Sequence, residues 1–301
     1  MFMHLLLSVL VAAPAVWSHP GLIPRAVPQV VYSCQNQDEI ALTFDDGPYI
    51  YLRQISDAFT AANASATFFM NGNNWDCIYE PARMSDVEYA YKAGHMIGSH
   101  TWGHTDLTAN LTHDQINDQM FRMEQAFSRI IGVIPAFMRP PYGNYNDDVL
   151  SVMSSRGQSA AMWDTDTGDA DGNTVATSES VYDEVANSGV QNALILEHET
   201  LKNTTEQLVP YAIKLFQSKG FKVSHSLARI MALLNEFSLL PWRNALALNP
   251  IKPLELSQLR MQSTWTCKDT PAPGAACGGS IPCQTAQVTV SPNPTPTPTS
   301  T

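Results

Sequence analysis

The sequence predicts an α/β fold, a distorted and incomplete (β/α) barrel with about seven parallel strands. Short apolar runs alternate with amphipathic helical patterns from Val30 to Val223. Gly157 and Gly220 close helical patterns directly before the next apolar run, as glycines do at helix C-termini. Strands that alternate with helices form a parallel sheet with the helices outside, and its functional residues lie at the C-terminal strand ends.

The expected strands are short apolar runs. They are residues 40–44, 66–70, 95–99, 136–139, 159–163, 193–196 and 221–223. The clearest helix follows Thr112, because Thr112 and Gln115 form the Thr-x-x-Gln pattern of a capping box. Apolar residues then recur at helical spacing as far as Ile130, and Gly132 ends the pattern.

Composition favours a large folded core. Of the 301 residues, 44% are hydrophobic and 15% are charged, which excludes a globally disordered chain. The formal charge of −11 argues against nucleic acid or an anionic membrane surface as a partner, but it allows a neutral glycan. No later apolar run is long enough to cross a bilayer, and we expect a monomer.

The chain begins with the features of an exported protein. An apolar run over residues 5–16 precedes Ser18, a plausible cleavage neighbourhood, although a buried N-terminal helix is the alternative. The asparagines of three N-glycosylation sequons are Asn63, Asn110 and Asn203. We therefore expect residues 1–18 to be a signal peptide and the protein to be secreted, to the extracellular space or the cell wall.

The rest of the chain divides into four parts. They are an N-terminal segment (19–33), a main domain (34–223), a segment of doubtful origin (224–259) and a tail (260–301). The tail contains cysteines and ends in proline alternating with threonine or serine, a composition that cannot form a core, so we expect disorder. The chain has five cysteines, and in an oxidising compartment some should pair, leaving at least one out.

Carboxylates and histidines directly follow the expected strands. Residues 43–48 read TFDDGP, so Asp45 and Asp46 end the first strand side by side. Two adjacent carboxylates repel each other unless a cation or a proton intervenes, although a solvated Asp-Gly-Pro turn is the alternative. Residues 100–104 read HTWGH, and this spacing places both imidazoles on one face of a helical turn, within reach of one metal ion.

This combination predicts a hydrolytic metal site. Two histidines and one carboxylate supply three ligands and leave one coordination position open. The metalloprotease pattern has a glutamate base after its first histidine, but Thr101 stands there, so Asp45 or Asp46 has to supply the base. Arg139 can orient a carboxylate, and His198 follows a strand on the same rim.

Five segments, in this order, resemble the motifs of polysaccharide deacetylases, the NodB-homology enzymes of carbohydrate esterase family 4. They are residues 43–48 (TFDDGP), 100–104 (HTWGH), 139–143 (RPPYG), the segment around Asp169, and 196–198 (LEH). The resemblance covers residues 34–223, and it implies the NodB-homology type of barrel. Together with the export features, the sequence is most similar to fungal chitin deacetylases.

The resemblance implies a metal site and a base. The implied ligands of Zn²⁺, or of another divalent ion such as Co²⁺, are Asp46, His100 and His104. The ion would acidify a water molecule whose proton Asp45 takes as general base, and Arg139 would position Asp45.

The resemblance also implies residues for the later steps. The backbone N–H of Tyr142 would stabilise the oxyanion, and His198 would protonate the leaving amine while Asp169 holds it as imidazolium. Trp163 and Leu196 are candidates for the wall of the substrate pocket.

The sequence departs from the family pattern at two places. Ala170 stands where a tryptophan commonly follows the aspartate of the fourth motif, which leaves Asp166 as an alternative partner of His198. Residues 224–259 resemble nothing in the family, and our hypothesis is that they are translated intron sequence. A genuine C-terminal helix is the alternative, because apolar residues from Leu227 to Phe237 have helical spacing.

The expected activity is metal-dependent hydrolysis of N-acetyl groups from N-acetylglucosamine polymers, which converts chitin or chito-oligosaccharides to chitosan and acetate. An O-acetyl esterase, such as an acetylxylan esterase, is an alternative because the same metal and base serve both reactions. An inactive glycan-binding wall protein is a further alternative.

Overall fold

A curled parallel sheet forms the centre of the domain. The computed structural model describes residues 29–34 and 36–225. Eight of its nine strands lie in the order β1-β6-β5-β4-β3-β2-β8-β7, and the ninth, β9, pairs with β2. All pairings between these strands are parallel. Among the described residues β1 and β7 end the order without pairing to each other, which confirms the predicted incomplete barrel.

The strands are short except for two at the centre. They are β1 (Val30–Val31), β2 (Glu39–Asp45), β3 (Thr67–Met70), β4 (Met96–Ser99), β5 (Phe137–Met138), β6 (Ser159–Ala161), β7 (Thr165–Asp166), β8 (Asn192–His198) and β9 (Lys222–Val223). Sequence analysis predicted all of these except β1 and β7. β2 is buried along its whole length, as expected for a parallel strand covered on both faces.

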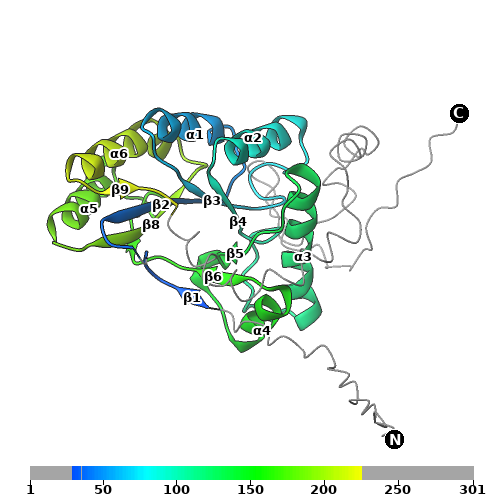
Figure 1. The fold of residues 1–301 in the computed structure, drawn as a ribbon. Coiled ribbons are helices and arrows are strands. Elements are labelled where there is room, and N and C mark those ends of the chain that lie inside the picture. The colour runs from blue at the N-terminus through cyan, green and yellow to red at the C-terminus, as the bar shows by residue number, and fades with distance from the viewer. Residues whose placement is uncertain (1–28, 35, 226–301) are drawn as a thin grey trace, which may run out of the picture.

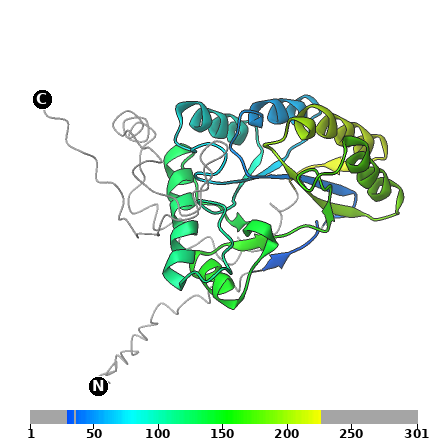
Figure 2. The ribbon, with the colours of Figure 1, turned by 180° about the vertical axis from the view of Figure 1, so that it is seen from behind.

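Helices cover the outside of the sheet (Figure 1), and the view from behind shows the same arrangement (Figure 2). They are α1 (Leu52–Ala61), α2 (Pro81–Lys92), α3 (His113–Ile130), α4 (Asp147–Arg156), α5 (Val175–Asn187) and α6 (Val209–Ser218). The predicted capping box opens α3, where Thr112 and Gln115 bond to each other's backbone N–H groups. Gly157 ends α4 in the left-handed conformation, and Gly220 follows α6 with a φ of 88°.

The largest core lies between the central strands and the helices that cover them. Phe44 of β2 stacks on Phe68 of β3, with ring centroids 5.5 Å apart, and meets Phe59 of α1 edge-on at 5.8 Å. All three side chains are fully buried. Buried apolar surface stabilises a fold by about 25 cal/mol per Å². This core therefore stabilises the strands whose ends carry the predicted site residues.

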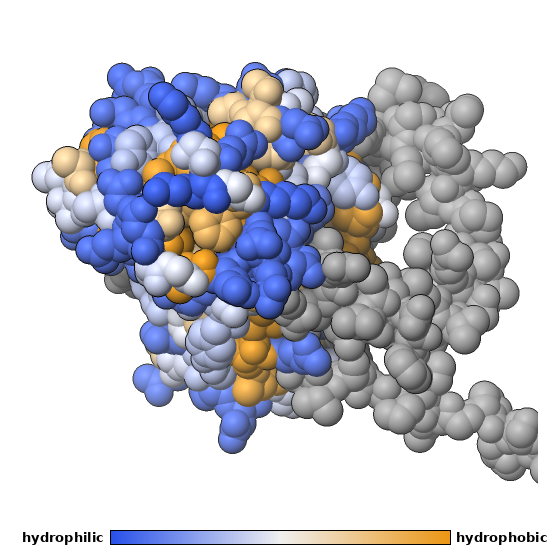
Figure 3. All heavy atoms as spheres, turned by 60° about the vertical axis from the view of Figure 1, so that its left-hand side comes forward, coloured by the Kyte–Doolittle hydropathy of each residue, from blue (hydrophilic) through white to orange (hydrophobic). Residues whose placement is uncertain are grey.

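Several predicted segments lie outside the described residues. They are the signal peptide (1–18), most of the N-terminal segment, residues 226–259 and the tail (260–301). Within the described chain, no helix combines the length and apolar character needed to cross a membrane. The face of the domain in Figure 3 is largely hydrophilic with separate apolar patches between, which is ordinary for a globular domain.

Candidate active site

The C-terminal ends of neighbouring strands bring most of the predicted site residues together. They are Asp45 and Asp46 at the end of β2, His100 and His104 after β4, Arg139 after β5, and His198 at the end of β8. β2 and β8 pair in a register that sets Asp45 opposite His198. The predicted base and the predicted acid therefore sit on neighbouring strands.

Asp46, His100 and His104 form a candidate metal site. One ligand atom from each lies within 4.8 Å of the other two. Asp46 Oδ1 is 3.2 Å from His104 Nε2 and 3.8 Å from His100 Nε2. His100 Nδ1 lies 2.7 Å from the carbonyl oxygen of Arg139, so Nδ1 donates and Nε2 keeps its lone pair for a metal. Burial lowers the pKa of His100 to about 3, which keeps the ring neutral, as a metal ligand must be.

The two histidines do not share a helical turn, so that part of the prediction was wrong. Residues 100–106 form an irregular loop, in which Thr101 and His104 have φ values of 70° and 52°. Asn71 after β3 and Gln119 of α3 hold this loop through side-chain hydrogen bonds to its backbone. The rings meet, with centroids 4.9 Å apart, because the backbone reverses through left-handed conformations that histidine spacing does not reveal.

Asp45 lies beside the candidate metal site and is almost completely buried. Arg139 Nη1 donates to Asp45 Oδ1 at 2.9 Å, and Asp45 Oδ2 lies 3.6 Å from His100 Nε2. Arg139 is fully buried and also donates to the carbonyl oxygens of Ala161 and Met162, both at 2.8 Å. Burial raises the pKa of Asp45 although the charge of Arg139 opposes the shift, so this carboxylate is more basic than an exposed one.

His198 is paired with Asp169. His198 Nδ1 lies 2.8 Å from Asp169 Oδ1, and the backbone N–H of His198 donates to Asp169 Oδ2 at 2.8 Å. Burial alone would lower the pKa of His198, but the hydrogen bond and the charge of Asp169 raise it to about 9. Asp166, the alternative partner, instead accepts a hydrogen bond from the backbone N–H of Gly168. His198 therefore carries a proton at neutral pH.

Tyr142, Trp163 and Leu196 surround the central residues. Tyr142 is 65% exposed in the short helix η1 (Pro141–Gly143), with a φ of 59°, and its ring contacts that of His104 at a centroid distance of 4.8 Å. The guanidinium of Arg139 lies 5.5 Å from the ring centroid of Trp163. Leu196 is buried within β8. A positive φ at a bulky residue such as Tyr142 is strained and is common at functional sites.

Comparison with known proteins identifies the family. Residues 32–161 match the family model described as polysaccharide deacetylase. A chitin deacetylase from Pestalotiopsis sp is 34% identical over 222 residues, which cover 73% of this chain and 72% of that relative. The chain belongs to the polysaccharide deacetylase family. It is a hydrolase, and the predicted resemblance to this family is confirmed.

Two further relatives extend the comparison. The solved chitin deacetylase of Colletotrichum lindemuthianum aligns with a TM-score of 0.63 and 29% identity, over 66% of this chain and 90% of that one. A peptidoglycan-N-acetylglucosamine deacetylase from Bacillus cereus is 31% identical over 166 residues, 55% of this chain and 57% of that relative. The incomplete parallel barrel is thus the fold of known deacetylases.

Sequence analysis of this deacetylase missed the residues that support the site. Asn74 Nδ2 donates to Asp46 Oδ1 at 3.2 Å, and the Thr204 hydroxyl donates to Asp169 Oδ2 at 2.7 Å. Asn71 and Asn74 could have been found, because they follow β3 at the same sheet edge. β3 lies between β2 and β4, and predicted site residues follow both of these strands. The position of β3 was therefore the available signal.

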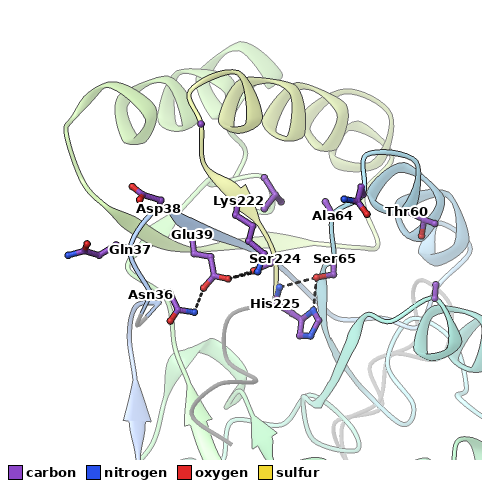
Figure 4. Close-up of a pocket in the computed structure, with 14 residues that line it drawn as sticks. Asn36, Gln37, Asp38, Glu39, Thr60, Ala64, Ser65, Lys222, Ser224 and His225 are labelled. Atoms are coloured by element: carbon purple, nitrogen blue, oxygen red, sulfur yellow. Dashed lines mark hydrogen bonds and ion pairs between the residues drawn. The ribbon is translucent and has the colours of Figure 1, made fainter. Parts of the chain in front are cut away.

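A hollow lies at the opposite end of the deacetylase barrel, near the N-terminal ends of β2 and β9 (Figure 4). Its volume is about 850 Å³. Glu39 is buried there and accepts hydrogen bonds from Ser224 at 2.6 Å and Lys222 at 3.1 Å, and His225 contacts Ser65. None of the predicted site residues lines this hollow.

Proposed function

We propose that this deacetylase uses a divalent metal ion to remove N-acetyl groups from N-acetylglucosamine polymers, with chitin or chito-oligosaccharides as substrate. The observation that carries the proposal is the convergence of Asp46, His100 and His104 to within 4.8 Å, next to the buried Asp45. Chitin is favoured because the Pestalotiopsis and Colletotrichum relatives are both named chitin deacetylases.

The donor set suits Zn²⁺, and Co²⁺ could replace it. Two imidazoles and one carboxylate are the ligand types of catalytic zinc sites, and they leave one position open. The hydrogen bond from His100 Nδ1 to the Arg139 carbonyl fixes the tautomer that a metal needs. An ion bound there would acidify a water molecule and polarise the acetyl carbonyl.

The surrounding residues supply the proton transfers. Asp45 takes the proton of the attacking water, and Arg139 keeps Asp45 oriented through the 2.9 Å bond to Oδ1. The Tyr142 N–H is the proposed donor to the oxyanion. His198 gives its Nε2 proton to the amine nitrogen as the C–N bond breaks, while Asp169 holds Nδ1, and acetate is the second product.

Aromatic residues at the rim support a sugar substrate. Tyr49 contacts both Tyr51 and Trp75, with ring centroids 5.9 Å and 5.5 Å apart. Trp75 is 39% exposed and follows Asn74, which bonds to Asp46. Aromatic faces pack against the apolar faces of sugar rings, so we propose these three rings, with Trp163 and Leu196 nearer the acetyl group, as substrate contacts.

We also propose that the domain spans residues 34–223 and that the enzyme is a secreted, monomeric glycoprotein with paired cysteines. The asparagines of all three sequons are exposed, which supports glycosylation.

Acetate release from chitin oligomers tests the proposal. We expect a chelator to abolish release and added Zn²⁺ to restore it. The matched control is Asp45→Asn, which should still bind Zn²⁺ but lose about 100-fold or more in kcat because the base is gone. Release from acetylated xylan or peptidoglycan and not from chitin would contradict the substrate, and folded, zinc-loaded protein without acetate release from any of these glycans would contradict the activity.

A further inference from the structure

Glu199 is a fully buried carboxyl that the proposed reaction does not use. It directly follows His198 at the end of β8, and its backbone N–H donates to the carbonyl oxygen of Asp45 at 3.2 Å. Its Oε1 accepts a hydrogen bond from the backbone N–H of Tyr49. One residue thus bonds to both ends of the loop over residues 45–49, which carries the proposed base and one proposed metal ligand.

The side chain of Glu199 also fills the middle of this loop. A Cβ atom on Gly47 would lie 1.7 Å from Glu199 Oε2, so only glycine fits at position 47 in this arrangement. Oε2 has no hydrogen-bond partner among the described residues. A buried polar atom without a partner is destabilising, so the stability of the domain does not account for a glutamate here.

The loop needs support because its backbone is strained. Asp46 has a φ of 75°, a left-handed conformation that costs aspartate less than most residues but is still less favourable than a right-handed one. On the side of β3, the backbone N–H of Asn71 donates to the Gly47 carbonyl oxygen at 2.6 Å, and Asn74 bonds to the Asp46 side chain. Glu199 supplies the corresponding support on the side of β8.

We propose that Glu199 is a positioning residue that fixes the loop carrying Asp45 and Asp46 against the strand end that carries His198. The proposal rests on the proposed roles of these three residues. Through Tyr49 and Gly47, Glu199 sets where the Asp46 carboxylate meets the two histidines and where Asp45 faces the substrate.

The protonation state of Glu199 decides which substitution imitates it. Burial raises the pKa of Glu199 to about 8; the Tyr49 N–H and the charge of Arg83 oppose the shift, and Asp86 and Asp46 add to it. Glu199 is therefore largely neutral at pH 7, and glutamine reproduces its shape, its neutrality and its acceptor for the Tyr49 N–H. Methionine has a similar length and suits a buried site, but it offers no comparable acceptor.

Glu199→Gln and Glu199→Met, made in the whole chain, separate positioning from burial. We expect E199M to fold and to bind Zn²⁺ about 10- to 100-fold more weakly, as for other residues that orient metal ligands. Its kcat on chitin oligomers should fall by a similar factor, and its KM should change less, because Glu199 bonds to the backbone of Tyr49 and not to its ring. E199Q should stay within about threefold of wild type in both measurements.

Two further variants test the contact itself. Gly47→Ala should reproduce the loss seen in E199M, and the double variant G47A/E199A should lose less than the sum of its single changes, because the smaller side chain makes room for the new Cβ. The stability control is Glu39→Met, which removes a buried glutamate at the opposite end of β2 and should leave Zn²⁺ affinity unchanged.

Equal Zn²⁺ affinity and equal kcat in folded E199M and E199Q would overturn the role of Glu199. Additive effects of G47A and E199A would overturn the direct contact. A wild-type chain that neither binds Zn²⁺ nor releases acetate would instead contradict the proposed function, and that result is visible before any variant is compared.

Discussion

The charge of Asp169 sets the pH range over which His198 is protonated and can act as the proposed acid. The pKa of His198 is raised to about 9 by this partner, so the imidazolium form is present through neutral pH and is lost as the pH rises through 9. The same shift stabilises the fold, fully below the unfolded pKa near 6.5 and progressively less as the pH rises to 9.

Asp169→Asn should therefore move the alkaline limb of kcat to lower pH. The asparagine keeps an acceptor for Nδ1 but loses the negative charge, so the pKa of His198 falls and activity at pH 8 drops more than activity at pH 6. The measurement is a pH profile of acetate release from chitin oligomers. The matched control is Thr204→Val, which removes one donor to Asp169 but keeps its charge, and it should shift the limb much less. Superimposable profiles for D169N and wild type would contradict the proposed acid.

Residues that end a strand in a recognisable pattern could be predicted, and those that act through folded loops could not. Asp45 and Asp46 come at the end of an apolar run in the sequence. Functional residues of a parallel barrel lie at the C-terminal ends of its strands, so this position alone predicts that both belong to the site. Glu199 stands equally close to a strand end, but its importance depends on its burial and on its fit against Gly47. Both properties arise only when β2 and β8 lie side by side.

At the scale of elements, α3 has a capped N-terminus and also holds the histidine loop. Only the first of these features could be predicted from the sequence. Its capping box is local, since Thr112 and Gln115 are three residues apart, and it was predicted from spacing. Its hold on the histidine loop was not, because Gln119 Oε1 accepts from the Gly103 N–H at 2.9 Å and the Gln119 carbonyl accepts from the Trp102 N–H at 3.0 Å. That contact joins a helix to a loop with left-handed backbone conformations. No sequence pattern predicts these conformations, so the contact could not be predicted.

Two substitutions on α3 should separate these features. Thr112→Ala removes the cap and should lower the free energy of unfolding by about 1 kcal/mol, with Zn²⁺ affinity unchanged. Gln119→Ala leaves the Gly103 N–H unpaired in a buried site and should weaken Zn²⁺ binding by about 10-fold. Urea denaturation and Zn²⁺ titration of both variants give the comparison. Loss of Zn²⁺ affinity in T112A as large as that in Q119A would show that general helix stability, and not the hold on the loop, governs the site.

At the scale of the whole molecule, the barrel includes a contact between its last strand, β9, and the first strand that was predicted, β2. β9 pairs with the start of β2, and the chain then continues through Ser224 and His225, which bond to Glu39 and Ser65. The fold class of such a barrel follows from the alternation of strands and helices. The closing contacts could not be predicted, because the sequence from Ser224 onward loses its family character. Ser224 and His225, the first two residues of the doubtful segment, are thus bonded to the domain.

Ser224→Ala tests whether this closure supports the fold. Ser224 donates at 2.6 Å to the buried carboxylate of Glu39, and the variant should lower the free energy of unfolding at pH 7 by about 1.5–3 kcal/mol, the range for a hydrogen bond to a charged group.

Burial opposes ionisation of Glu39, but the bonds from Ser224, Asn36 and Lys222 lower its pKa below 4.5. This stabilisation is therefore present above pH 4.5 and is lost as the pH falls through the lowered value, so the deficit of S224A should shrink in acid. Lys222→Ala is the control, because the Lys222 side chain is 73% exposed and an exposed ion pair contributes about 0–1 kcal/mol. Urea titrations at pH 7 and pH 3 provide the measurement, and equal stability of S224A and K222A at pH 7 would mean that the barrel is held without its last described residues.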